Sequence, residues 1–289
     1  MSPSAIDTIR RALAEDLGAG DITSDCFIPP DHTSLAQIVA KEACIIAGTD
    51  AAVEVFRSVD PSIEVVVEIS DGKFIPAGRT ILTARGHTRA LLAAERTALN
   101  FLQRLSGIAT LTRQFVNAVA GTKAAILDTR KTTPGLRAFE RLAVAAGGGT
   151  NHRLGLFDQV LAKDNHLVVA RAAAALQAAV DLAKHKRPDI TIEIECDDLG
   201  QVCTLLALRG IDIILLDNMD NEQLREAVRL RGSSPVLLEA SGGVNLLTVR
   251  AIADTGVDRI SVGALTHSAR AVDLSMEVSP SSALWLERL

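Results

Sequence analysis

The feature that most constrains the fold is a regular alternation of short apolar runs and Ala- and Leu-rich segments beyond Thr122. The apolar runs have the length and composition of strands, and helical stretches of roughly 10 to 15 residues lie between them. Six candidate strands follow one another at 124–128, 159–163, 191–195, 212–217, 235–240 and 259–263. This pattern predicts a parallel α/β barrel or open sheet, and six strands are too few for the eight of a complete barrel.

Polar side chains follow nearly every candidate strand. The segments after the strands are Thr129-Arg130-Lys131, Asp164-Asn165-His166, Cys196-Asp197, Asn218, Ser241-Gly242-Gly243 and Ala264-Leu265-Thr266-His267. The carboxyl ends of parallel strands meet at one rim of a barrel, where loops and helix N-termini converge. We therefore expect an active site at this rim.

Several cations lie close to these strand ends. They are Arg130, Lys131, His152, Arg153 and Lys163. An Arg guanidinium binds a planar carboxylate through two parallel hydrogen bonds, and Lys acts as a point charge for phosphate. The set predicts a cleft for a substrate pair that carries both groups, although a solvated basic face is the alternative.

The later strands end in small or acidic residues. Ser241-Gly242-Gly243 and Val262-Gly263-Ala264 are short glycine loops that let backbone N–H groups approach a phosphate, although ordinary strand-to-helix turns look the same. Glu195 and Asp217 end neighbouring strands and could hold ribose hydroxyls or a magnesium ion, or pair structurally with Lys163. Glu193 and Glu239 are weaker candidates for the same inner face.

The first part of the chain has a different pattern. Ser4 and Asp7 resemble a capping box and predict a first helix over 4–17. Short β-rich runs between 34 and 84 predict a small antiparallel sheet. Two helical segments over 88–120 meet near Ser106-Gly107 and lead into the barrel.

Composition limits the remaining possibilities. With 289 residues, of which 48% are hydrophobic, the chain can fill the cores of one large and one smaller domain. A net charge of -5, without a run of Lys and Arg, argues against a nucleic-acid partner. We expect no secretory signal and no membrane span. Four cysteines without zinc-type spacing fit buried thiols in a reducing cytoplasm.

At these positions the chain resembles the quinolinate phosphoribosyltransferase family. The matching segments are 95–100, 106–110, 128–131, 147–156, 163–166, 216–218, 241–243 and 262–267. The similarity runs from Glu15-Asp16-Leu17-Gly18 nearly to the end, and only 279–289 matches nothing recognisable. The family has an N-terminal α/β sandwich domain and a C-terminal incomplete barrel. The resemblance therefore implies a sandwich domain over 1–112, joined by 270–289, and a catalytic α/β barrel over 113–269.

The resemblance also implies a reaction and an assembly. Members transfer a phosphoribosyl group from 5-phosphoribosyl 1-pyrophosphate to quinolinate with loss of CO2, giving nicotinate mononucleotide for NAD biosynthesis. They are cytoplasmic pentosyltransferases that work as homodimers or as larger assemblies up to a hexamer. An arginine crosses to the neighbouring subunit, and by position it is Arg96.

Family analogy assigns the site residues. Quinolinate would lie among Arg96 of the neighbouring chain, Thr129, Arg130, His152, Arg153 and Lys163. The phosphoribosyl donor would use Lys131, Lys163, Glu195, Asp217, Ser241, Gly242, Gly243, Val262, Gly263, Ala264 and His267, with Mg²⁺ held by Glu195 and Asp217. Positioning and electrostatics would then perform the chemistry without a protein nucleophile.

Three alternatives stay open. A sister phosphoribosyltransferase would accept another planar acid, and comparison of substrates separates it. A barrel lyase would use Lys163 as a Schiff-base lysine, and borohydride trapping with a keto substrate detects it. A non-catalytic protein that kept the fold would have lost some of the charged positions, and none is lost.

Overall fold

The structure is a computed structural model, and it describes residues 2–167 and 172–280. The chain divides into two compact units. The first consists of Met1–Arg113, Thr133–Gly148 and Ala269–Leu289, and the second of Gln114–Thr132 and Gly149–Ser268. The expected barrel domain was continuous over 113–269, whereas the contacts group 133–148 with the first unit. The last nine residues of the expected tail lie outside the described part.

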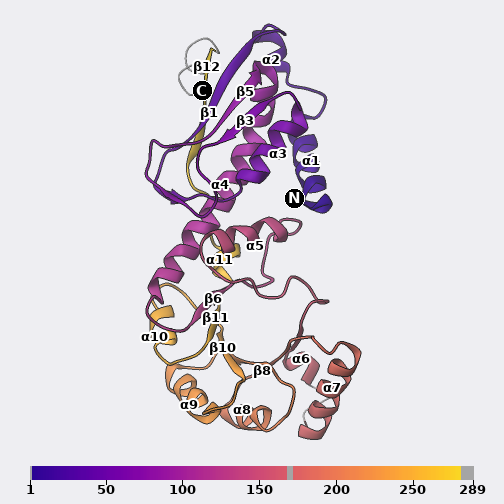
Figure 1. The fold of residues 1–289 in the computed structure, drawn as a ribbon, viewed down its shortest axis with the longest axis vertical. Coiled ribbons are helices and arrows are strands. Elements are labelled where there is room, and N and C mark those ends of the chain that lie inside the picture. Colours follow the sequence, from indigo (N-terminus) through magenta and orange to yellow (C-terminus); the bar gives the residue numbers. More distant parts are fainter. Residues whose placement is uncertain (1, 168–171, 281–289) are drawn as a thin grey trace. The chain divides into compact units, whose positions relative to one another are not determined.

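The first unit is built on a four-stranded antiparallel sheet with the order β12-β1-β5-β3. Its strands are β1 (Thr33–Ala40), β3 (Glu64–Val67), β5 (Thr80–His87) and β12 (Leu274–Pro280), and β2 (Cys44–Ile45) pairs with β4 (Phe74–Ile75). β12 pairs with β1 from Leu274 opposite Ala40 to Pro280 opposite Ser34, so the end of the described chain completes the sheet. The helices are α1 (Pro3–Leu17), α2 (Ile22–Phe27), α3 (Thr49–Val59), α4 (Thr88–Ala118) and α5 (Arg137–Ala146) (Figure 1).

The start of α1 differs from its prediction. Ser2 is the N-cap and its side chain accepts the N–H of Ala5. Pro3 occupies the first helical position, where its fixed φ suits a helix and its missing N–H costs nothing. The capping residue therefore lies two positions before Ser4.

The prediction of two helices over 88–120 was wrong. α4 is one continuous helix from Thr88 to Ala118, and Gly107 lies within it. A β-carbon on Gly107 would lie 1.9 Å from the backbone oxygen of Arg270. The glycine therefore allows another segment of the same unit to approach the helix, and it does not end the helix.

Substitution of Gly107 tests this packing. In most helices Gly→Ala is stabilising, by about 1 kcal/mol. Here we expect Gly107→Ala to destabilise the protein by about 3 kcal/mol, because a backbone oxygen has to move. Urea unfolding measures the change. Gly200→Ala is the control, because Gly200 is an exposed glycine in a helix with only the Asp198 carboxylate nearby, at 3.1 Å. Equal stabilities of the two variants would contradict the packing argument.

Glu42 holds the segment that leads into β12. Its carboxylate pairs with the Arg270 guanidinium at 2.5 Å and accepts the Asp273 N–H at 2.9 Å. The hydrogen bonds from Arg270 and Asp273 lower the pKa of Glu42 to about 2. A carboxylate with a lowered pKa stabilises the fold above its unfolded pKa, and this contribution is lost as the pH falls toward the folded pKa.

The lowered pKa of Glu42 predicts how the stability of the protein depends on pH. We expect Glu42→Gln to melt at a lower temperature than the wild type above about pH 4.5. The difference should shrink as the pH falls from about 4.5 through the folded pKa of about 2, because Glu42 becomes protonated over this range. Melting curves across this range measure it, and a difference that stays constant or grows would show that the ion pair is not its source.

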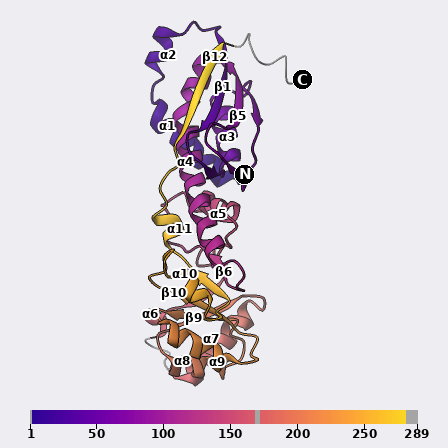
Figure 2. The same ribbon diagram turned by 90° about the vertical axis from the view of Figure 1, so that its left-hand side faces the viewer.

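The second unit contains a six-stranded parallel sheet with the order β6-β11-β10-β9-β8-β7 (Figures 1 and 2). Its strands are β6 (Ala125–Leu127), β7 (Val160–Ala162), β8 (Ile192–Cys196), β9 (Ile213–Asp217), β10 (Leu237–Ser241) and β11 (Arg259–Ser261). All six match predicted strands, and β6 and β7 stay as edges, so the barrel is incomplete as expected. The helices are α6 (Asp164–Leu167), α7 (Ala173–Lys186), α8 (Leu199–Leu206), α9 (Asn221–Arg231), α10 (Val249–Ala253) and α11 (Ala264–His267).

Both faces of the central strands are buried, as in other parallel sheets. In β8, Ile192 and Ile194 alternate with Glu193 and Glu195, and all four are buried. One face of the sheet is therefore apolar, while the other carries charge. No helix in the described part of the chain is both long and apolar enough to cross a membrane.

Candidate active site

A pocket of about 700 Å³ lies within the second unit. Its strand residues occupy alternate positions, as expected for one face of a sheet. The lining residues are Thr129, Arg130, Lys131, His152, Arg153, Leu156, Leu161, Lys163, His166, Leu215, Asp217, Asn218, Glu239, Ser241, Gly242, Gly243 and Ser261. The structure thus brings together most of the residues that the sequence predicted for the site.

Two arginines enter the pocket from different segments. Arg130 follows β6, and Arg153 follows Thr150, which forms a parallel bridge with Leu127 of β6. Burial lowers the pKa of Arg153, and the positive charge of Arg130 lowers it further. Two like charges held near each other favour an anion between them.

Lysine and carboxylates meet at the ends of β7, β8 and β9. The Lys163 ammonium is paired with the Glu195 carboxylate, and Asp217 ends the adjacent strand β9. Burial raises the pKa of Asp217, and the negative charge of Glu195 adds to the rise. The ion pair that we considered as a structural role for Glu195 is present, and Glu195 does not itself line the pocket.

The glycine loops differ from each other. Ser241, Gly242 and Gly243 line the pocket, and both glycines have positive φ, 97° and 60°. The next helix, α10, begins only at Val249, so the loop itself lines the pocket without a helix N-terminus directly after it. Gly263 is the N-cap of α11, and a β-carbon there would lie 3.0 Å from Lys131 Cδ and 3.1 Å from His267 Nε2.

Six predicted residues do not line the pocket: Arg96, Glu195, Val262, Gly263, Ala264 and His267. Val262 is buried, whereas His267 is exposed and shares a hydrogen bond with Ser268 at 2.7 Å. Arg96 is exposed on α4 in the first unit. Its predicted role needs a second chain and stays a prediction.

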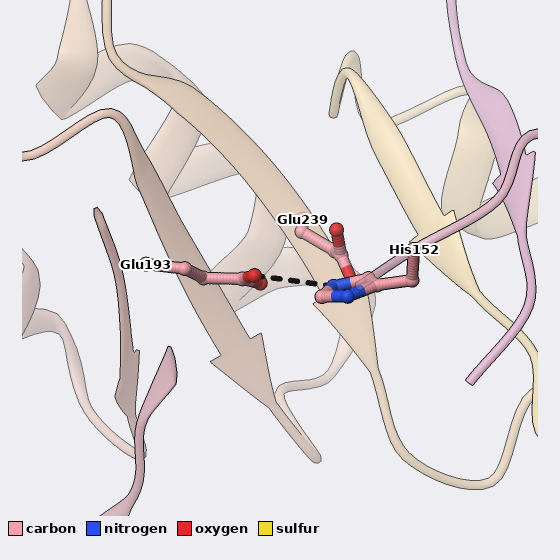
Figure 3. A group of neighbouring side chains, drawn as sticks. All are labelled: His152, Glu193 and Glu239. Carbon is pink, nitrogen blue, oxygen red and sulfur yellow. Dashed lines mark ion pairs between the residues drawn. The ribbon is translucent and has the colours of Figure 1, made fainter. Parts of the chain in front are cut away.

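His152 is held among buried acids (Figure 3). Its Nε2 lies 3.1 Å from Glu193 Oε2 and 3.2 Å from Glu239 Oε1, and both glutamate side chains are fully buried. Arg259 Nε donates to Glu239 at 2.7 Å and Gln159 Nε2 donates to Glu193 at 2.5 Å. The Arg259 guanidinium and the Gln159 amide therefore help to offset the negative charge of the two buried glutamates.

Opposing effects act on the His152 ring. Burial disfavours its charged form, but the hydrogen bonds and charges of Glu193 and Glu239 raise the pKa of His152 to about 9. Nδ1 lies 2.8 Å from the Arg153 backbone nitrogen and accepts its N–H while Nδ1 carries no proton. Nε2 then carries the ring proton and faces the two glutamates.

Both ring nitrogens of His152 are thus bonded within the protein. The buried Asp128 carboxylate also accepts the His152 backbone N–H at 2.6 Å, which fixes the main chain. A hydrogen bond from this ring to a substrate would require one of these bonds to break. Contact between His152 and quinolinate stays a prediction, and the structure adds the role of fixing the backbone of Arg153.

The same three side chains have ligand types for a metal. Their ligand atoms lie within 4.8 Å of one another. However, Nε2 bears the proton, and Arg259 already neutralises Glu239. We therefore describe the group as a hydrogen-bonded charge cluster.

Glu239→Ala tests the cluster. The change leaves His152 and Arg259 without their shared buried acceptor, so we expect a loss of about 3 to 5 kcal/mol in unfolding free energy. Glu239→Gln keeps an acceptor and should cost less. Guanidinium unfolding of both variants makes the comparison, and a stable Glu239→Ala protein would contradict the account.

Sequence reasoning did not include several pocket residues among the binding residues. The apolar ones are Leu156, Leu161 and Leu215, and the polar ones are His166, Asn218 and Ser261, while Glu239 was predicted only as a weaker candidate for the inner face. Alternation along the strands could have found Leu161, Leu215 and Ser261, because they share a face with Lys163, Asp217 and Gly263. Asn218 directly follows a predicted strand and was expected at the rim of the active site, but without a binding role of its own.

Fold and site together define a class. A six-stranded parallel sheet carries, at one end, a pocket that combines Arg, Lys, paired carboxylates and a Ser-Gly-Gly loop. These features define an incomplete α/β-barrel enzyme that acts on anionic substrates.

Comparison with known proteins gives the family. The sequence matches the profiles described as "Quinolinate phosphoribosyl transferase, N-terminal domain" over residues 21–106 and "Quinolinate phosphoribosyl transferase, C-terminal domain" over residues 108–277. The chain therefore belongs to the quinolinate phosphoribosyl transferase family, and the resemblance inferred from the sequence is confirmed.

Individual relatives agree over nearly the whole chain. The nicotinate-nucleotide pyrophosphorylase [carboxylating] of Mycobacterium leprae is 45% identical, over 95% of this chain and 97% of that protein. The probable enzyme of the same name from Bacillus subtilis is 40% identical, over 93% and 91%. The solved nicotinate-nucleotide pyrophosphorylase of Francisella tularensis has a TM-score of 0.88 at 40% identity, covering 96% of this chain and 98% of that chain.

Proposed function

We propose that this chain transfers a phosphoribosyl group from 5-phosphoribosyl 1-pyrophosphate to the ring nitrogen of quinolinate. The products are nicotinate mononucleotide, pyrophosphate and CO2, and the step belongs to NAD biosynthesis. The observation that carries the proposal is one pocket that holds two arginines, two lysines, two carboxylates and a Ser-Gly-Gly loop. Membership of the family gives the reaction its name.

The cationic side of the pocket suits a pyridine dicarboxylate. Arg130 and Arg153 bind its two carboxylates, and Thr129 and Lys163 add a hydroxyl and an ammonium. Leu161 and Leu215 provide apolar surface for the ring. Arg96 of a neighbouring chain adds a further cation in a homodimer or hexamer.

The acidic side suits the phosphoribosyl donor. Carboxylate oxygens of Glu195 and Asp217 are the hard ligands that Mg²⁺ prefers, and the raised pKa of Asp217 is the mark of a carboxylate whose charge lacks full compensation. Glu195 and Asp217 would hold Mg²⁺, and the bound ion would supply positive charge for the pyrophosphate. Lys131 and the 241–243 loop hold the phosphates, with Val262, Gly263, Ala264 and His267 around the 5-phosphate.

The chemistry needs positioning and charge. The pyridine nitrogen forms a bond to the anomeric carbon as the bond to pyrophosphate breaks, so the ring nitrogen becomes cationic. The bond to the adjacent carboxylate then breaks, CO2 leaves, and the ring carbon takes up a proton. Arg130 and Arg153 orient the dicarboxylate for the first step, and the electrostatic field of the pocket favours the charge changes. We place the enzyme in the cytoplasm.

A direct assay tests the proposal. Purified protein is incubated with quinolinate, phosphoribosyl pyrophosphate and Mg²⁺, and CO2 and nicotinate mononucleotide are followed. We expect equal amounts of both products, and a loss on the order of 100-fold in kcat/KM for Arg130→Ala and Arg153→Ala. EDTA should abolish the activity, and added Mg²⁺ should restore it.

Arg229→Ala is the matched control. Arg229 is exposed, pairs with Glu226 on α9 and lies outside the pocket, so its loss should leave kcat/KM unchanged. Turnover of nicotinate or another planar acid in place of quinolinate would assign the chain to a sister phosphoribosyltransferase. Covalent trapping by borohydride with a keto acid would instead indicate the lyase.

A further inference from the structure

Asn218 has an unusual backbone conformation beside the carboxylate of Asp217. Within residues 2–167 and 172–280 it is the only non-glycine residue with positive φ, at 54°. Asn tolerates this left-handed region better than most residues, but other side chains rarely adopt it. Such conformations persist where the surrounding structure holds them, and they are common at functional sites.

The side chain of Asn218 uses this conformation to reach Asp217. Its Nδ2 donates to Asp217 Oδ2 at 2.6 Å. A carboxylate with one oxygen bonded to an amide is limited in rotation, and its other oxygen keeps a defined direction. Both residues line the pocket, so this orientation is set within the site.

The backbone of Asn218 also contacts the glycine loop. Its N–H donates to the Ser241 carbonyl at 2.9 Å, which extends the pairing of β9 with β10 beyond Asp217. A β-carbon on Gly242 would lie 2.1 Å from Asn218 Oδ1 and 3.0 Å from its backbone nitrogen. Gly242 therefore serves two purposes, because it adopts φ 97° and leaves room for the Asn218 amide.

From these contacts we propose that Asn218 is a positioning residue that orients Asp217 for Mg²⁺ and fixes it relative to the Ser241-Gly242-Gly243 loop. One residue thus aligns the metal-binding carboxylate with the phosphate-binding loop. The inference rests on the proposed function, because it takes Asp217 as a ligand of Mg²⁺ bound with phosphoribosyl pyrophosphate. It adds a role for a residue that binds neither the metal nor the pyridine ring.

Two substitutions distinguish the effect of the Asn218 side-chain amide from the effect of its backbone conformation. Asn218→Gly removes the amide and keeps a residue that adopts positive φ readily. Asn218→Ala removes the amide and also strains the backbone, so it should melt about 2 to 4 °C below Asn218→Gly. Both lack the hydrogen bond to Asp217, and the two variants should therefore have the same binding defect.

Calorimetric binding of phosphoribosyl pyrophosphate, with saturating Mg²⁺ and with EDTA, measures that defect. With Mg²⁺ we expect Asn218→Gly to bind phosphoribosyl pyrophosphate about tenfold more weakly than the wild type does. Hydrogen bonds that orient a metal ligand contribute at least about that much to metal affinity. With EDTA the two proteins should bind alike, and quinolinate binding should not change. Asn221→Ala is the control, since it removes an amide three residues further along, outside the pocket.

The outcomes distinguish the two claims. If Mg²⁺ tightens donor binding by the same factor in the wild type and in Asn218→Gly, the role of Asn218 is overturned while the metal site stands. If Mg²⁺ does not tighten binding to the wild type, the metal site fails and the inference fails with it. A tenfold loss in both Asn218 variants, present only with Mg²⁺, supports the proposal.

Discussion

The rest of the site depends on two fully buried glutamates, Glu193 and Glu239, whose carboxylates need hydrogen-bond donors. Buried carboxylates are stable only with bonded donors, and Gln159, His152 and Arg259 provide them. Because the His152 Nε2–H is directed at these acids, Nδ1 is left to accept the Arg153 N–H. A charge cluster in the sheet thereby fixes the backbone of a pocket arginine.

The positive pocket is thus local in a chain of net charge -5. Its cations come from the segments after β6 and Thr150 and from the end of β7, and its carboxylates and glycines come from β9, β10 and the loop after β10. Parallel strands bring these segments to one end without requiring them to be close in sequence. The cationic part of the pocket is the one that we propose for the dicarboxylate, and the acidic part is the one that we propose for the phosphoribosyl donor.

The spacing of apolar residues and the places of polar residues after them made much of the fold and of the site predictable. The six barrel strands followed from apolar runs, and Arg130, Arg153, Lys163 and Asp217 followed from their places after those runs. Contacts between distant segments were not predictable. Gly107 looked like a helix end because the Arg270 carbonyl that requires it lies far along the chain, and Asn218 gave no sign of its positive φ. The ring bonds of His152 likewise depend on three separate strands and loops.

A crystal structure of the chain with quinolinate bound would place the substrate directly. We expect one carboxylate within hydrogen-bond distance of Arg130 and the other near Arg153 and Lys163, with the ring nitrogen facing Asp217 and the 241–243 loop. Quinolinate bound elsewhere, or with its carboxylates directed away from both arginines, would contradict it.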